Sequence, residues 1–192
     1  MRKIMIIGAG GIGSYLVSFL DRIGLYDITV FDDDDVEIKN LTYQNYEEED
    51  VGHKKVSGLE SKFGSISKAE PYVVLVKQQL ENYDLVVCCA DNLSVRRLLY
   101  REGYGEDIQN KWLDLRSQRR NAALISYKTD PTLQDAMLDG PDGSFSCQGT
   151  DWEGDAEGID TMHIAIAGIA TQWIQKWFND NNDVIDKMVV NV

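Results

Sequence analysis

Residues 4–14 read IMIIGAGGIGS, and this stretch decides the fold. Four apolar residues run into the pattern Gly8-x-Gly10-x-x-Gly13, with another glycine at Gly11. A continuous apolar run is typical of a strand buried on both faces, and the apolar spacing that follows predicts a helix over 14–23. Glycines between a strand and a helix allow a tight turn and let phosphate approach the helix N–H groups. We therefore expect a nucleotide-phosphate loop at Gly8, Gly10, Gly11 and Gly13.

Charge and composition narrow the possible partners. The chain has 192 residues, a size that fits one domain, and its net charge is −13. An acidic surface repels nucleic acid and anionic membrane, so we expect neither as a partner. It also repels free ATP, so a nucleotide site needs cations of its own. Three cysteines without metal-site spacing are typical of a reducing compartment. With no signal peptide and no membrane-length apolar run, we expect one cytoplasmic domain over 1–192.

The rest of the pattern predicts an α/β fold, a Rossmann-like three-layer αβα arrangement. Its N-terminal half should be parallel and its C-terminal half should contain antiparallel strands. Residues 116–121 are too few for a crossover helix, so the strand after them should return antiparallel. Residues 129–158 show little periodicity, and a loop of this length is usually functional or disordered. Expected strands are 3–7, 27–31, 71–76, 84–89, 112–115, 122–127 and 186–192; expected helices are 14–23, 51–63, 92–104 and 159–178.

An acidic run follows the second expected strand. Asp32 comes about 20 residues after the last glycine, where an acidic residue accepts ribose hydroxyls. Asp33 and Asp35 are as well explained by a solvated loop as by a binding role. Asp32 and Asp34 differ from Asp33 and Asp35, because they lie where the strand leaves the sheet on its ligand side. We therefore expect both of these carboxylates at the nucleotide site.

Four motifs in this order resemble the ThiF/MoeB/HesA family, the relatives of ubiquitin-activating enzymes. Its first motif, Gly-x-Gly-Gly-x-Gly-Ser, fits residues 8–14. Asp-x-Asp-x-Val-x-x-x-Asn-Leu-x-Arg-Gln is matched at Asp32, Asp34, Val36, Asn40, Leu41 and Gln44. Val-Gly-x-x-Lys is matched at Val51, Gly52 and Lys55, and Thr-Asp-Asn with a later Arg at Asp91, Asn92 and Arg96, with Ala90 replacing Thr. The resemblance extends to 168–172 and the last strand, so it covers nearly the whole chain.

This resemblance implies Mg²⁺- and ATP-dependent adenylylation of a carboxylate, usually the C-terminus of a small ubiquitin-like or sulfur-carrier protein. By the same resemblance Asp32 holds the ribose, Asn40, Gln44 and Lys55 contact the triphosphate, and Asp91 coordinates magnesium. A lysine ammonium suits phosphate, and a hard carboxylate after a central strand suits magnesium. The alternatives are that Lys55 is a surface lysine and Asp91 a helix N-cap.

Several residues depart from the family pattern or leave a choice open. Tyr43 stands where the family has its phosphate-binding arginine, and a phenol carries no charge. The zinc-binding Cys-x-x-Cys pairs are missing. Arg116, Arg119 and Arg120 either replace the absent phosphate cations or pair with Asp-rich loops. Cys147 lies in the loop that carries sulfur chemistry in some relatives, but acids surround it in sequence, so an ordinary loop thiol is the alternative.

Assembly and function give the last expectations. The relatives act as symmetric dimers, and the helix expected at 159–178 has more aromatic residues than one core face needs, which predicts a homodimer. The leading function is an active adenylyltransferase. The alternative is a catalytically weak or inactive nucleotide-binding or interaction module, because Tyr43 removes a cation. An NAD-type oxidoreductase comes third, since it shares the glycine loop and Asp32, but Asp91 with Asn40, Gln44 and Lys55 argues against it.

Overall fold

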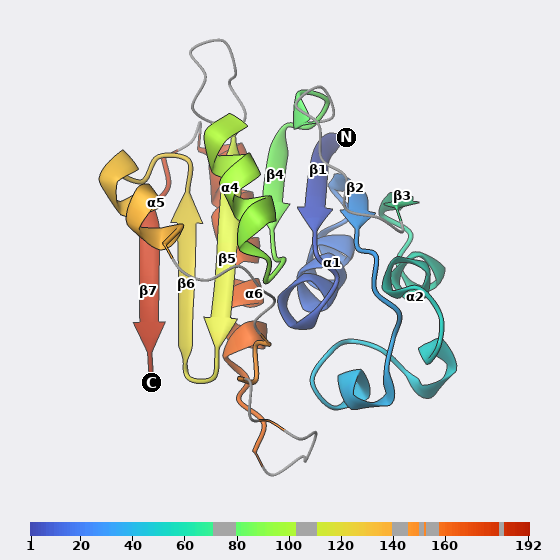
Figure 1. Ribbon diagram of the computed structural model, residues 1–192. Helices are drawn as coiled ribbons and strands as arrows, with labels where there is room; N and C mark the ends of the chain where they lie inside the picture. Colours follow the sequence, from blue (N-terminus) through green and yellow to red (C-terminus); the bar gives the residue numbers. More distant parts are fainter. Residues whose placement is uncertain (71–79, 103–110, 140–145, 150–151, 153–157, 181–182) are drawn as a thin grey trace.

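A seven-stranded mixed sheet forms the centre of the molecule (Figure 1). The computed structural model describes residues 1–70, 80–102, 111–139, 146–149, 152, 158–180 and 183–192. The strands are β1 (Arg2–Ile7), β2 (Tyr26–Phe31), β3 (Ile66–Glu70), β4 (Leu85–Cys88), β5 (Trp112–Gln118), β6 (Asn121–Ser126) and β7 (Lys187–Asn191). Their order is β3-β2-β1-β4-β5-β6-β7. In the part of the sheet formed by β3, β2, β1, β4 and β5, neighbouring strands are parallel. The pairs β5–β6 and β6–β7 are antiparallel, so the predicted fold class is confirmed.

Helices cover both faces of this sheet. They are α1 (Gly11–Ile23), α2 (Lys55–Lys62), α4 (Leu93–Glu102), α5 (Pro131–Met137) and α6 (Met162–Asn179), with 3₁₀ turns η1 (Ile38–Thr42) and η2 (Glu48–Asp50). Helices α1, α2 and α6 share one core cluster with Ile4 and Ile6 of β1. Met5 and Ile7 belong to the opposite cluster with α4 and α5. This two-sided burial explains why β1 reads as an unbroken apolar run.

Helix α1 shows how local sequence sets an element's ends. It starts at Gly11, earlier than the apolar spacing predicts, because the glycine loop itself forms the first turn. It ends at Gly24, which has φ +70° and donates its N–H to the Leu20 carbonyl. Glycine adopts this left-handed conformation without steric cost, so the predicted stop is confirmed.

Four elements differ from the sequence prediction or fall outside the described chain. Helix α2 begins at Lys55 rather than residue 51, and β3 occupies Ile66–Glu70, where no strand is predicted. The strand predicted at 71–76 lies outside the described residues. Within the predicted irregular loop, Pro131–Met137 is helical, with the Asp130 side chain accepting the Thr132 N–H at 2.9 Å. In the described part of the chain, no helix is long and apolar enough to cross a membrane.

Candidate functional site

A pocket of about 700 Å³ lies where β1, β2 and β4 end. These strands run in parallel, so their carboxyl ends meet at one edge of the sheet, the edge at which open α/β sheets bind ligands. Four separate sequence motifs contribute to its wall. The predicted site residues that line the pocket are Gly8, Gly10, Gly11, Asp32, Asp34, Asn40, Gln44, Lys55 and Asp91. Gly13, which is also predicted to belong to the site, does not line it.

The glycines of the loop have different tasks. Gly8 has φ +95°, and a Cβ there would lie 2.7 Å from the Ala90 nitrogen. A Cβ at Gly13 would lie 1.9 Å from the Gly8 carbonyl oxygen, so Gly13 packs α1 against the turn. Gly10, the N-cap of α1, faces open space on the pocket side, and no side chain caps the helix there. The pocket therefore borders a helix N-terminus, whose dipole and N–H groups favour an anion.

Asp32 ties the acidic run to this loop. Its carboxylate accepts the Ala9 N–H at 2.6 Å and the Asp34 N–H at 2.9 Å, and the residue is 7% exposed. Burial raises the pKa of Asp32, against the lowering effects of Lys55 and of the two backbone bonds. Each carboxylate oxygen has a second lone pair, so Asp32 can hold the loop and still accept a bond from the pocket.

Lys55 reaches the pocket through main-chain pairing of two loops. Gly52 donates to the Val36 carbonyl at 2.9 Å, and the Lys55 N–H donates to the Asp34 carbonyl at 3.0 Å. The Lys55 ammonium then lies 2.7 Å from the Asp34 carboxylate. Burial would lower the pKa of Lys55, but Asp32 and Asp34 outweigh it and the pKa is raised. Lys55 is 7% exposed, so the alternative of a surface lysine is wrong.

Asn40 and Gln44 come from the η1 segment and are both buried. The Asn40 side-chain oxygen accepts the Glu37 N–H at 2.8 Å, so it holds the start of η1. The Tyr46 hydroxyl donates to the Ala9 carbonyl at 2.7 Å and fastens this segment to the glycine loop. Gln44 Oε1 has no hydrogen-bond partner among the described residues. A buried carbonyl oxygen without a partner is costly, and the NH₂ of the same side chain is a donor suited to a bound anion.

Asp91 follows β4 and is half-buried in the pocket wall. The predicted alternative was that it caps α4. Asn92 does this instead, since its side-chain oxygen accepts the Ser94 N–H at 2.8 Å and the Ser94 hydroxyl at 2.6 Å. The N-cap alternative for Asp91 is therefore wrong, and the cap is one residue later.

Comparison with known proteins identifies the family of this chain. The model of the ThiF family matches residues 1–185. The chain belongs to the ThiF family. It is 28% identical to the probable molybdopterin-synthase adenylyltransferase of Gracilaria tenuistipitata var. liui, over 69% of this chain and 40% of that protein. It is 32% identical to the adenylyltransferase and sulfurtransferase UBA4 of Yarrowia lipolytica, over 51% and 27%. The chain thus spans less than half the length of these curated relatives.

Solved structures share this ThiF-family fold across the whole chain. PaaA superposes with a TM-score of 0.69 at 17% identity, over 100% of this chain and 61% of that one. The E. coli MccB structure with ATP has a TM-score of 0.66 at 17% identity, over 100% and 60%. At this level of identity the similarity establishes the fold.

The position of the family's arginine is occupied by an aromatic cluster in this ThiF-family chain. Tyr43 is 8% exposed and packs edge-on against Trp152, with ring centroids 5.0 Å apart. The His163 ring lies 6.0 Å away, and its burial lowers its pKa, so it is neutral at pH 7. Both Tyr43 and Trp152 line the pocket, yet neither carries a charge.

Cys147 also lines the pocket, at the first turn of α1. Its sulfur lies 3.3 Å from the position of a Cβ on Gly11. Burial, with a further contribution from Asp91, raises the pKa of the Cys147 thiol to about 11. Because the thiolate is the nucleophile, this environment favours the ordinary thiol over a thiol-transfer role.

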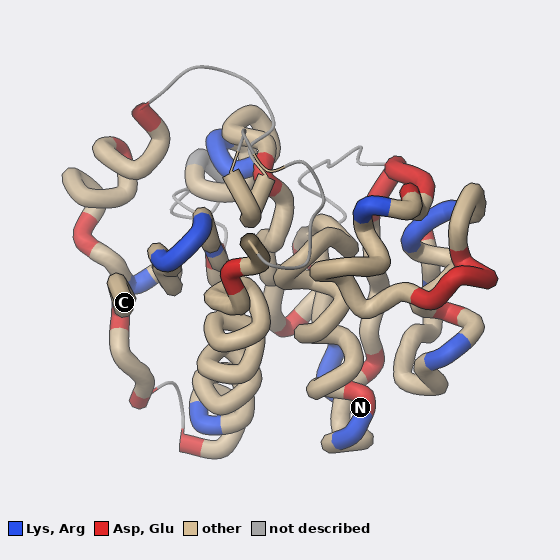
Figure 2. The backbone as a smooth tube through the Cα atoms, turned by 90° about the horizontal axis from the view of Figure 1, so that it is seen from below, with Lys and Arg blue, Asp and Glu red and all other residues tan. Residues whose placement is uncertain are grey.

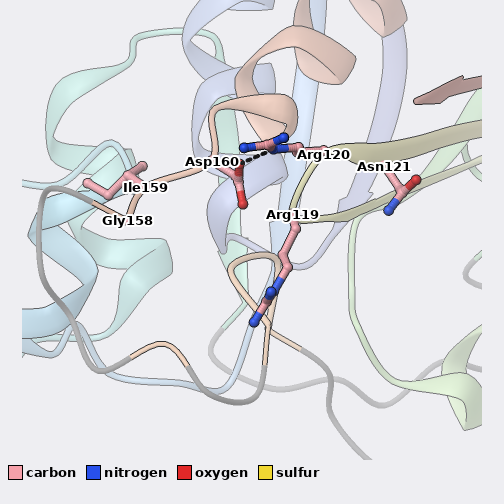
Figure 3. A pocket seen from close by; sticks show the side chains of 6 residues that line it. All are labelled: Arg119, Arg120, Asn121, Gly158, Ile159 and Asp160. Atoms are coloured by element: carbon pink, nitrogen blue, oxygen red, sulfur yellow. Dashed lines mark ion pairs between the residues drawn. The ribbon is translucent and has the colours of Figure 1, made fainter. Parts of the chain in front are cut away.

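The three arginines separate from one another. Arg116 donates to the fully buried Asp114 at 2.8 Å, and Arg96, the last residue of the fourth motif, donates to it at 3.0 Å. Figure 3 shows Arg119 and Arg120 leaving the β5–β6 turn in different directions, Arg120 towards Asp160 at 3.9 Å. They border a separate pocket of about 450 Å³. None of the three lines the 700 Å³ pocket, so they do not replace the missing arginine there.

The aromatic residues of α6 do not form the surface that the homodimer prediction requires. Trp173 and Trp177 are 4% and 5% exposed and belong to the chain's own core. The Trp173 N–H donates to the Ile185 carbonyl at 2.9 Å, which fixes its ring inside the molecule. The argument from α6 is therefore wrong, and the homodimer stays a prediction without this support.

Proposed function

We propose that residues 1–192 act as one nucleotide-binding domain that adenylylates a carboxylate with Mg²⁺ and ATP. The substrate class we infer is the C-terminus of a small ubiquitin-like or sulfur-carrier protein in the cytoplasm. One observation carries the proposal: Lys55, Gln44 and Asp91, from three separate motifs, border one pocket beside the glycine loop. The names of the curated relatives, adenylyltransferases, support the same reaction type.

The pocket has features that suit a nucleotide. Gly10 leaves open space at an uncapped helix N-terminus, where a phosphate would meet N–H groups. Gln44 lies in the same wall, and its side-chain NH₂ would donate to a phosphate oxygen. Asp91 is a hard oxygen ligand at the end of a central strand and is not used as the helix cap. These residues fit both ATP and a magnesium ion.

In the proposed reaction, an oxygen of the substrate carboxylate attacks the α-phosphorus of ATP. A bond forms between them, the bond to the β-phosphate oxygen breaks, and pyrophosphate leaves with its electron pair. Asp32 would hold the ribose, while Lys55 and Gln44 would orient the phosphates and stabilise their charge. Asp91 would hold magnesium, whose charge neutralises the leaving pyrophosphate.

A second candidate is a nucleotide-binding module with little or no activity. The observation that favours it is Tyr43, which is buried against Trp152 and gives the pocket no positive charge. Such a module would bind ATP without exchanging pyrophosphate into it. The two candidates therefore differ in one measurable reaction.

Pyrophosphate exchange tests the proposal. With magnesium and a carrier protein ending in Gly-Gly, we expect the chain to exchange labelled pyrophosphate into ATP. Asp91→Asn removes the metal-binding charge and should reduce exchange by about a hundredfold, or about 2.7 kcal/mol. Asp183→Asn, at an exposed position after α6, is the matched control and should exchange normally. ATP binding without exchange by the unaltered chain would favour the module, and full exchange by Asp91→Asn would refute the magnesium role.

A further inference from the structure

The pocket wall has few positive charges for a site meant to hold a triphosphate. Of the described residues that line it, the cationic ones are Lys39 and Lys55. Asp32, Asp33, Asp34, Glu37 and Asp91 line the same pocket, and the chain's net charge is −13. An anionic ligand therefore depends strongly on these two lysines.

The positive charge of Lys55 alone is not enough to offset the negative charge of the phosphates. Its ammonium is paired at 2.7 Å with Asp34 and feels the charge of buried Asp32 as well. The two carboxylates offset its positive charge before any ligand arrives. A second cation has to supply the remaining attraction.

Lys39 lines the pocket and is held only by an exposed ion pair, so its ammonium can move to a phosphate. It lies in η1, one turn before Tyr43, and pairs with Glu37 at 2.8 Å. The side chains of Lys39 and Glu37 are 56% and 62% exposed. An exposed ion pair of this kind contributes little free energy and is easily exchanged for another partner. Lys39 can therefore leave Glu37 for a phosphate at small cost.

The electrostatic surroundings of Lys39 agree with this position. The hydrogen bond to Glu37 raises the pKa of Lys39, burial opposes it, Tyr43 adds to the rise and Lys55 reduces it. The ammonium therefore lies near both Tyr43 and Lys55, which line the same pocket. With its pKa raised above 10.5, Lys39 is fully protonated at neutral pH.

We propose that Lys39 is a phosphate-binding cation of this pocket and supplies, from η1, the positive charge that Tyr43 does not. On ATP binding its ammonium exchanges the Glu37 carboxylate for the β- or γ-phosphate, while Lys55 keeps its pairing with Asp34. This inference rests on the proposed function, because it assumes that the pocket takes ATP. It concerns one residue of that site that the family motifs leave unspecified.

Calorimetry with ATP and with AMP, both with magnesium, tests the role of Lys39. We expect Lys39→Gln to weaken ATP binding about tenfold, as for a lost charged hydrogen bond, and to change AMP binding less than about twofold. Lys54→Gln is the matched control: Lys54 is an exposed lysine paired with Asp35 at 2.8 Å in the neighbouring loop, and it does not line the pocket. It should bind both nucleotides normally.

A second variant tests the exchange of partners. Glu37→Gln removes the competing carboxylate but keeps an oxygen to accept the Asn40 N–H, so η1 should persist. ATP should bind more tightly to Glu37→Gln than to the unaltered chain, and this gain should vanish when Lys39→Gln is added. Thermal unfolding of each variant provides the check on folding.

The outcomes separate this inference from the proposed function. Equal ATP affinity for Lys39→Gln and the unaltered chain would overturn the role of Lys39 and leave the proposed function standing. Parallel losses of ATP and AMP affinity would also overturn it, because a phosphate contact must discriminate between them. If the unaltered chain binds ATP without pyrophosphate exchange, the reaction fails but the lysine is still judged by binding. Absence of any ATP binding would refute both.

Discussion

At position 43 the chain has a phenol where the ThiF/MoeB/HesA pattern has a guanidinium. Its ring packs edge-on against Trp152 and His163, with ring centroids 5.0 Å and 6.0 Å away. Lys39 and Lys55 line the same pocket as the phenol. The missing positive charge at position 43 is therefore tied to the packing of several neighbouring side chains.

Restoring the arginine tests this interpretation. Tyr43→Arg should tighten ATP binding by at least about 1 kcal/mol, because a charged bond to phosphate is stronger than a neutral one. The gain should be larger when Lys39 is also replaced by Gln, since the new guanidinium would then share the pocket with Lys55 alone among the described lining residues. Tyr43→Phe serves as the control for loss of the hydroxyl. Calorimetry showing no gain in either background would contradict a shortage of charge at this position.

Helices and strands with a strong apolar periodicity can be predicted from the sequence, whereas those with a weak one cannot. The apolar spacing of α1 and its stop at Gly24 are both visible in sequence. Strand β3 is different, since Ser67 and Lys68 are exposed at the edge of the sheet and break the apolar run. The seven residues of α5 are too few for a period to stand out, although Asp130 and Pro131 give its start.

The candidate site shows the same division. The glycine loop, Asp32, Lys55 and Asp91 belong to motifs with fixed spacing, so their gathering in one pocket could be expected. Lys39 occupies an unspecified position of the second motif, directly before Asn40, and its place near Tyr43 depends on the turn of η1. Trp152 meets Tyr43 only through tertiary folding. The separation of Arg116 from its neighbours depends on Asp114, a buried partner that periodicity does not identify as an ion-pair residue.

The start of α1 provides a prediction at this scale. Gly10 is its N-cap and has room for a side chain, whereas a Cβ on Gly11 would meet Cys147 at 3.3 Å. Gly10→Asp therefore adds a favoured capping residue, which should preserve or slightly raise stability, by a few tenths of a kcal/mol. The same carboxylate occupies the place meant for phosphate, so ATP binding should be abolished.

Calorimetry and thermal unfolding together check this prediction. Gly64→Asp, at another glycine with open space around it, is the control and should bind ATP normally. If Gly10→Asp stays folded and binds ATP with unchanged affinity, α1 does not hold the phosphates. A loss of both folding and binding would instead show that position 10 tolerates no side chain.

For the molecule as a whole, charge sets the conditions under which a nucleotide can approach. Figure 2 views the protein from the edge where β1, β2 and β4 end, and acidic and basic segments lie side by side there. In this view the Lys and Arg segments are short and scattered among the other coloured parts of the tube. The long-range field is therefore dominated by the net charge of −13, while the lysines of the pocket act only at short range.

This balance predicts an unusual response to salt. Raising the salt from 0.01 M to 0.15 M shortens the screening length from about 30 Å to about 8 Å and hides the repulsion between protein and nucleotide. The association rate of a fluorescent ATP analogue should consequently increase with salt in stopped-flow measurements without magnesium. Magnesium should reduce this effect, because it lowers the charge of the ligand. An association rate that falls as salt is added would mean that the pocket's own cations control the approach.

The strand order also determines when a chain that is still being synthesised can first bind nucleotide. Residues up to 70 contain β1, α1, β2, α2 and β3, together with the glycine loop, Asp32 and Lys55. The turn at Gly8, however, rests against the backbone of Ala90, and Cys89 donates its N–H to the Ile7 carbonyl at 2.7 Å. A chain still on the ribosome and lacking β4 would therefore carry the glycine signature without the wall that supports it. Ligand could begin to stabilise the fold only after residue 91 has emerged, so nucleotide would act only once about half of the 192-residue chain has been made.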